Sequence, residues 1–285
     1  GHRLLQETLA VGRRPAVISA EVAAEGTKAM LDTLGDRYEM MDWASPMRCK
    51  FTAGETTARP HSVDQTDPIE RGDNVVTVVK PHVGGYTTEL ERTMFVGEPS
   101  DEQRTYFDIM TESQEIAIDT IEPGVEYAAV EDAVVSYYEE QGVAEFTQHH
   151  IGHNIGMEGH ERPFLDVAYD GEIRAGELYT VEPGFYVPGV GGFRHSDTVL
   201  VTEDGTESLT YYPREIDRLT VDAGGLSRPR RQIRRRGPTR SHSEPPRRLR
   251  VRRTARVRAR ELLLPHGVLR RHVLQTRRGA RHRRR

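Results

Sequence analysis

The feature that most constrains this 285-residue chain is an abrupt change of charge near residue 221. Residues 222–285 contain 23 Arg, no Lys and three acidic residues, which gives a net charge of +20. Residues 1–221 contain 17 basic and 41 acidic residues, which gives −24. Two parts of such different charge are expected to fold and bind differently. We therefore predict one folded domain over 1–220 and a separate Arg-rich tail over 221–285.

The Arg-rich tail contains too few apolar residues to offset the entropy lost on ordering, so we predict that it is disordered. Two interpretations of it stay open. It is a phosphate-binding arm that would contact nucleic acid, or it is an out-of-frame translation of GC-rich DNA, in which Arg codons dominate. The acidity of the preceding domain argues against nucleic acid as a partner of that part.

Composition excludes several kinds of protein. The single cysteine, Cys49, rules out an intramolecular disulfide framework and a multi-thiolate metal site. No apolar run reaches the roughly 18–20 residues that cross a bilayer, so no membrane partner is expected. Strong acidity with three lysines indicates a halophilic, cytoplasmic protein, because high salt screens the repulsion among carboxylates.

The pattern of apolar residues predicts helices and strands in an order typical of an α+β domain. Helices are expected over 21–34, after a Ser100 N-cap with Gln103 in the capping-box position, and over 125–141. Strands are expected over 74–79, 86–96, 178–182 and 198–202. This order predicts helices laid on one face of a mostly antiparallel sheet.

Four histidines lie within twelve residues: His149, His150, His153 and His160. Glycines interleave them, so that backbone could approach a ligand closely. Imidazole serves as acid, base or metal ligand near neutral pH, whereas a polar surface loop is the alternative explanation. We interpret the cluster as part of a functional site.

Carboxylates form the second group of candidates. Glu182 ends an apolar strand and precedes Pro183-Gly184, which can hold the carboxylate in a fixed direction. Glu89 and Glu91 are two residues apart, so on one strand they face the same side. On a buried face such a pair raises one pKa, which suits acid/base work, and on an exposed face it is merely solvated.

These motifs together resemble the family of creatinase, prolidase and methionine aminopeptidase, the "pita-bread" hydrolases, across about residues 1–213. Six blocks match in order and spacing: Thr52–Thr56 with Pro60-His61, Gly72–Val75, Gly85–Thr93, Gly152–Pro163, Val181–Gly184, and Arg194–Gly205.

The resemblance implies a fold of two αβ halves around a curved antiparallel sheet, with the site on its concave face. Relatives of the prolidase and creatinase type carry an additional N-terminal domain, which is apparently missing from this chain. Such relatives are usually homodimers in which the partner's N-terminal domain closes the site.

The resemblance also assigns metal ligands, since metal-dependent members bind two divalent ions through Asp, Asp, His, Glu and Glu. The second Asp falls at Glu89, and the His and first Glu fall at His153 and Glu182. The first Asp falls at Val78 and the last Glu at Ser196, so two ligand positions are lost. Because bridging carboxylates hold two ions together, we expect either no cofactor or one weakly bound Mn, Zn or Fe ion at Glu89, His153 and Glu182.

The motif that includes Glu91 is most similar to creatinase, a member that works without metal. By this resemblance Glu91 and Glu182 hold a cationic nitrogen of the substrate, and His61 is the acid/base. His153 and His160 would polarise or position the scissile group. The remaining expected substrate-binding residues are His149, Glu89, Arg194 and His195.

The expected function is therefore hydrolysis of a C–N bond in a small-molecule or short-peptide substrate. One alternative is an Xaa-Pro aminopeptidase or dipeptidase that retains a single metal ion, which metal analysis and chelation would distinguish. Another alternative is a non-catalytic pita-bread module that binds peptide, or nucleic acid through its Arg-rich tail. Salt-dependent nucleic-acid binding that is lost on removing 222–285 would identify this last case.

Overall fold

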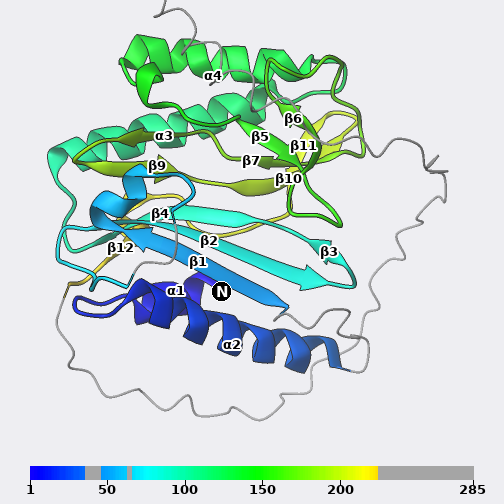
Figure 1. Cartoon of the computed structure of the whole chain (residues 1–285). Helices are drawn as coiled ribbons and strands as arrows, with labels where there is room; N and C mark the ends of the chain where they lie inside the picture. The colour runs from blue at the N-terminus through cyan, green and yellow to red at the C-terminus, as the bar shows by residue number, and fades with distance from the viewer. Residues whose placement is uncertain (36–45, 63–65, 224–285) are drawn as a thin grey trace, which may run out of the picture. The chain divides into compact units, whose positions relative to one another are not determined.

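Two five-stranded sheets form the frame of the structure (Figure 1). The computed structural model describes residues 1–35, 46–62 and 66–223, which lie within one compact unit bounded by Gly1 and Ser227. The Arg-rich tail beyond residue 223 lies outside the described residues, so its disorder stays a prediction. The division into a catalytic domain over 1–220 and a tail stays a proposal.

The first sheet has the strand order β1-β2-β4-β12, with β3 paired to β2. The strands are antiparallel except for β12, which runs parallel to β4. Helices α1 and α2 cover one face of this sheet, shown in blue in Figure 1, and α2 packs on β1. The elements are α1 (His2–Thr8), α2 (Pro15–Leu34), β1 (Met47–Ala53), the 3₁₀ turn η2 (Gly54–Ala58), β2 (Asn74–Val83), β3 (Tyr86–Thr87), β4 (Leu90–Val96) and β12 (Thr220–Val221).

The second sheet has the order β11-β10-β7-β5-β6, and α3 and α4 cover its outer face (Figure 1). A separate hairpin, β8-β9, lies between β7 and β10 in sequence, and its strand β9 contacts both β4 and α3. The elements are α3 (Asp101–Thr120), α4 (Tyr127–Gln141), η3 (Ala144–Phe146), β5 (Gly152–Asn154), β6 (Glu161–Leu165), β7 (Leu178–Val181), β8 (Gly184–Val187), β9 (Gly191–Arg194), β10 (Asp197–Thr202), β11 (Gly205–Ser208) and α5 (Ile216–Leu219).

The two halves meet where Glu91 of β4 pairs with Ser196, one of the two residues between β9 and β10. The backbone N–H of Glu91 donates to the carbonyl of Ser196 at 2.9 Å, and the N–H of Ser196 donates to the carbonyl of Glu91 at 3.2 Å. The fully buried Arg92 secures this junction, since its guanidinium donates to both of these carbonyls. It also pairs with Asp197 at 3.0 Å.

The α+β class and the two αβ halves are confirmed, and most elements lie close to their expected positions. The capping box at Ser100 and Gln103 is present. Helix α2 begins at Pro15, six residues before the predicted start, because the buried Ile18 extends its apolar face toward the N-terminus. The strand predicted over 86–96 is divided into β3 and β4 at residues 88–89.

None of the helices in the described part of the chain is long and apolar enough to cross a membrane.

The junction yields a stability prediction. Replacing Arg92 with Gln should lower the free energy of unfolding in urea by about 3–5 kcal/mol, because Asp197 then stays buried without its cation. The control is Arg104→Gln, which removes a more exposed ion pair with Glu98 and should cost less than about 1 kcal/mol. Equal effects of the two substitutions would contradict a structural role for Arg92.

Candidate active site

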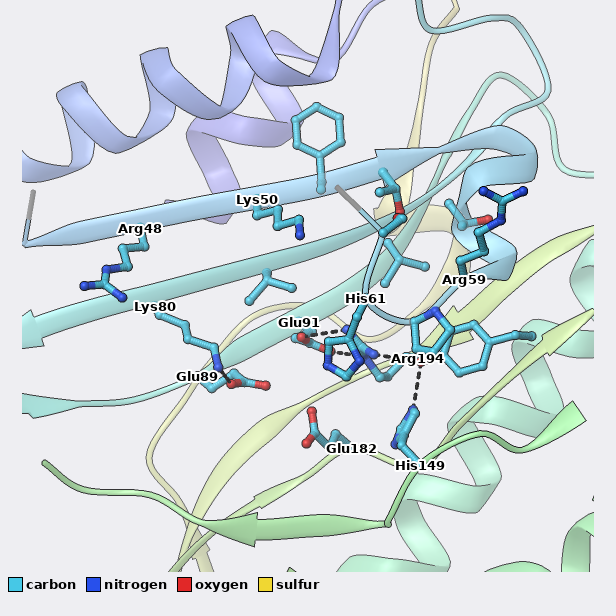
Figure 2. A pocket seen from close by; sticks show the side chains of 18 of the residues that line it. Arg48, Lys50, Arg59, His61, Lys80, Glu89, Glu91, His149, Glu182 and Arg194 are labelled. Atoms are coloured by element: carbon cyan, nitrogen blue, oxygen red, sulfur yellow. Dashed lines mark hydrogen bonds and ion pairs between the residues drawn. The ribbon is translucent and has the colours of Figure 1, made fainter. Parts of the chain in front are cut away.

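A cavity of about 270 Å³ opens between β1, β2 and β4 on one side and β8, β9 and the histidine-rich segment on the other (Figure 2). Its lining brings together three carboxylates, several cations and histidines from both halves of the fold. The charged and imidazole side chains in the lining are Arg48, Lys50, Arg59, His61, Lys80, Glu89, Glu91, His149, His150, His160, Glu182 and Arg194.

Strand geometry explains the position of two of the carboxylates. Glu89 immediately precedes β4 and Glu91 lies in it, and the alternation of side chains along the strand directs both into the cavity, as predicted. Both side chains are buried. On the neighbouring strand Val78 lies directly opposite Glu91, so an apolar side chain occupies the position that the resemblance assigns to the first Asp ligand.

Each of these two carboxylates has a side-chain cation as its partner (Figure 2). The ammonium of Lys80 forms an ion pair with Glu89. The guanidinium of Arg194 binds both oxygens of Glu91, with 2.9 Å between Nη2 and Oε1. Burial raises the pKa of Glu89, the neighbouring Glu182 and Glu91 raise it further, and Lys80 opposes them. Burial also raises the pKa of Glu91, against the influence of Arg194.

Glu182, which follows β7, faces two imidazoles instead. Its Oε1 lies 3.2 Å from Nε2 of His153 and 3.4 Å from Nε2 of His150. Burial by itself raises the pKa of Glu182, but the two imidazoles and Arg194 outweigh it and hold this pKa well below its ordinary range. Glu182 is therefore ionised at neutral pH.

Close packing of backbone places His153 beside Glu182. A Cβ atom on Gly152 would lie 2.0 Å from the carbonyl oxygen of Thr180, so only glycine lets β5 approach β7 this closely. The sequence suggested that such glycines allow approach to a ligand, whereas this one allows the approach of a neighbouring strand. His153 Nδ1 donates to the carbonyl of Asn154 at 2.9 Å, which leaves Nε2 toward Glu182.

A hydrogen-bond chain of fixed direction connects Arg194 to His149. Arg194 Nη1 donates to the Tyr186 hydroxyl at 2.7 Å, and that hydroxyl lies 2.8 Å from His149 Nε2. His149 Nδ1 must donate to the carbonyl of His150 at 2.7 Å, so Nε2 accepts from Tyr186. Burial lowers the pKa of His149 to about 3, and Arg194 contributes to this lowering, so the imidazole is neutral.

The two remaining histidines of the cavity are also neutral near pH 7. His61, in the exposed loop after η2, has a pKa lowered from 6.5 by partial burial and by the Arg194 guanidinium. Burial and the nearby His153 lower the pKa of His160 to about 4. The rings of His153 and His160 lie 4.2 Å apart between centroids.

Most of the predicted site residues converge on this cavity. The lining includes His61, Glu89, Glu91, His149, His160, Glu182 and Arg194. His153 is fully buried behind Glu182 and reaches the cavity only through that carboxylate and His160.

His195 requires a correction, because its fully buried ring packs edge-on against Phe107 and does not line the cavity. It is a core residue and not a substrate-binding one. The alternation of side chains after β9 directs Arg194 into the cavity and the next residue into the core.

Three functional side chains were not assigned a role from the sequence: Lys80, His150 and Tyr186. Lys80 lies two residues after Val78 on the same face of β2. This spacing, together with the small number of lysines in the chain, three in all, could have identified Lys80 from the sequence. The side-chain pairing of Arg194 with Glu91 spans 103 residues and left no local signal.

The pair of divalent ions implied by the resemblance does not fit these residues. Val78 has no donor atom, Ser196 offers only a buried hydroxyl, and the carboxylates of Glu89 and Glu91 already have cationic partners. The three residues predicted to hold a single ion, Glu89, His153 and Glu182, do not form one group of potential ligand atoms either. In the described residues, potential ligand atoms gather instead as His150, His153 and Glu182, and as Glu89, Glu91 and Glu182.

Comparison with known proteins agrees with this architecture. The chain is 34% identical to an Xaa-Pro dipeptidase of Pyrococcus horikoshii over 166 residues, which is 58% of this chain and 47% of the relative. It is 30% identical to an Xaa-Pro dipeptidase of Lactobacillus delbrueckii over 169 residues, 59% of this chain and 46% of the relative. The chain thus spans about half the length of the curated relatives it matches.

Solved structures show the same fold. The prolidase from P. horikoshii superposes with a TM-score of 0.67 at 28% identity, over 75% of this chain and 59% of that chain. An Xaa-Pro dipeptidase from Bacillus anthracis superposes with a TM-score of 0.69 at 29% identity, over 77% and 58%. The predicted pita-bread fold is confirmed. Since the sequence pattern of metallopeptidase family M24 also matches residues 2–203, this chain belongs to that family.

Proposed function

We propose that this chain carries the site of a hydrolase that cleaves a C–N bond in a small-molecule or short-peptide substrate without a dinuclear metal centre. The observation that carries the proposal is the pairing of Glu89 with Lys80 and of Glu91 with Arg194. A buried carboxylate needs a counter-charge, and here side chains of the same chain supply it. The Xaa-Pro dipeptidases among the relatives support a peptide-like C–N bond as the target.

Glu182 is the carboxylate available to the substrate. Both oxygens of Glu91 are bound by Arg194, so the role in holding substrate passes to Glu182, which no Lys or Arg of the described residues binds. An ionised carboxylate in a buried site forms strong charge-assisted hydrogen bonds to a cationic or amide nitrogen. Its neighbour His153 acts as a positioning residue, because it contacts Glu182 and does not line the cavity.

His61 is the proposed general base and acid. It is one of two exposed imidazoles that line the cavity, the other being His160, and its lowered pKa keeps it neutral near pH 7. It takes a proton from water as the water oxygen bonds to the scissile carbon, and it then gives that proton to the leaving nitrogen as the C–N bond breaks. His160 and the Arg194–Tyr186–His149 chain position the scissile group.

A second candidate is an Xaa-Pro peptidase that keeps one divalent ion, and one observation favours it. Nε2 of His150 and Nε2 of His153 have no hydrogen-bond partner, yet both face the same oxygen of Glu182. Each of these ring nitrogens needs a proton, or a cation shared with the carboxylate, to face it favourably. These three side chains would hold a single Zn, Mn or Fe ion, which when bound supplies Lewis-acid polarisation of a carbonyl.

The composition and the resemblance add to the proposal. The excess of acidic over basic residues in 1–221 supports a salt-adapted, cytoplasmic protein. The resemblance supports a homodimer.

Substitution of His61 tests the mechanism. His61→Ala should lower kcat by about 10²–10⁴-fold on the best substrate from a screen of Xaa-Pro dipeptides and of guanidino and amidino compounds. Added imidazole should restore part of the rate, and the urea midpoint should match that of the unsubstituted protein. An unchanged kcat would remove His61 from the mechanism.

The pH profile provides an independent test. His61 acts as a base only when neutral, and its lowered pKa keeps it neutral at pH values where an ordinary imidazole is protonated. The acidic limb of log kcat against pH should therefore fall below pH 6.5, and it should vanish in His61→Ala. A limb above 6.5, or one that survives the substitution, would count against this assignment.

Metal removal separates the two candidates. If side-chain cations have replaced the ions, protein dialysed against EDTA should keep its full rate, and elemental analysis should find no stoichiometric metal. If the single-ion candidate is right, activity should disappear with EDTA and one equivalent of metal should restore it. The variant His150→Ala should then bind Co²⁺ at least about tenfold more weakly, as followed by the absorption of the bound ion.

A further inference from the structure

The cavity reverses the charge balance of the domain around it. Residues 1–221 hold 17 basic and 41 acidic residues, but five basic and three acidic side chains line the cavity. Two of the three lysines of the whole chain, Lys50 and Lys80, are among them. So local an excess of cations in an acidic protein requires a specific explanation.

Two of these cations come from the edge strand β1. Arg48 and Lys50 are exposed and line the cavity (Figure 2), while Met47 in the same strand is buried. Within the described ranges 1–35, 46–62 and 66–223, no carboxylate forms an ion pair with Arg48 or Lys50. They differ in this from Lys80 and Arg194, whose charges are used by Glu89 and Glu91.

The register makes this arrangement costly. Arg48 lies directly opposite Lys80 on β2, and Lys50 lies opposite Val78. Lys80 is already paired with Glu89 and Val78 carries no charge, so neither opposing residue on β2 compensates the charge of Arg48 or Lys50. An anion bound between Arg48 and Lys50 would supply the missing counter-charge.

The cavity thus carries opposite charges on two sides, with Arg48 and Lys50 on β1 and the ionised Glu182 across from them (Figure 2). A volume of about 270 Å³ suits a small molecule. An anion that enters this cavity also lies near carboxylates. It must therefore belong to a molecule that also carries a neutral or cationic group able to donate a hydrogen bond to Glu182.

We propose that Arg48 and Lys50 form an anion subsite that binds the carboxylate of a zwitterionic substrate, whose scissile C–N group lies against Glu182. The subsite specifies the substrate class of the proposed hydrolase and rests on that proposed function. Two cationic side chains on one strand face can bind the two oxygens of a carboxylate with charge-assisted hydrogen bonds.

The test compares probes that differ only in the carboxylate. Binding of glycylproline and of glycylprolinamide, and of 3-guanidinopropionate and its amide, is measured by titration calorimetry on the full chain. At least one carboxylate probe should bind about tenfold or more tightly than its amide. The double variant Arg48→Gln/Lys50→Gln should bind both members of that pair alike. Arg174→Gln, which removes an exposed arginine outside the cavity, should keep the preference.

Each outcome supports or contradicts the proposed anion subsite. The proposal is wrong if neither carboxylate probe binds more tightly than its amide, or if the double variant retains the preference for the carboxylate. Loss of binding of both members of a pair in the double variant would also overturn it, because the cations would then serve the fold of the cavity. Turnover of the same probes, followed by NMR, reports separately on hydrolysis, so a preference without turnover counts against the proposed function and not against the subsite.

Discussion

The buried guanidinium of Arg92 is the interaction on which the arrangement of this site depends. It donates to the carbonyls of Glu91 and Ser196 and to Asp197, and it also donates to the carbonyls of Tyr212 and Pro213. All five of its N–H groups therefore have acceptors. Because one cation binds both halves of the fold at their junction, the strands that carry Glu91 and Arg194 are held at a fixed separation.

Charge compensation within the cavity follows from that separation. Once β4 and β9 are held together, Arg194 reaches Glu91 from the other half of the fold, while Lys80 reaches Glu89 from the adjacent strand. Buried carboxylates are stable only with a counter-charge, which either metal ions or side chains can provide. In this chain Lys80 and Arg194 provide it for Glu89 and Glu91. Under the proposed function, Glu182 and His61 meet the substrate, and Arg48 and Lys50 bind its carboxylate.

Local patterns predicted much of the fold because they depend on neighbours in sequence. The capping box of Ser100 and Gln103 and the β-branched run beginning at Asn74 each describe a few adjacent residues. Among the site residues, Glu89 and Glu91 were placed correctly on one face by their spacing. His195 was not, since the choice between cavity and core for adjacent residues depends on the twist and register of β9 and β10.

The sequence alone determined the elements of the fold, the family resemblance and the absence of donor atoms at Val78, because these are properties of residue type and order. Only the tertiary structure decided which charges meet. The pairing of Arg194 with Glu91 and the face-to-face placement of His150, His153 and Glu182 join residues that lie 29 to 103 positions apart. Electrostatic energies depend on distance and burial in space, and sequence separation does not specify either.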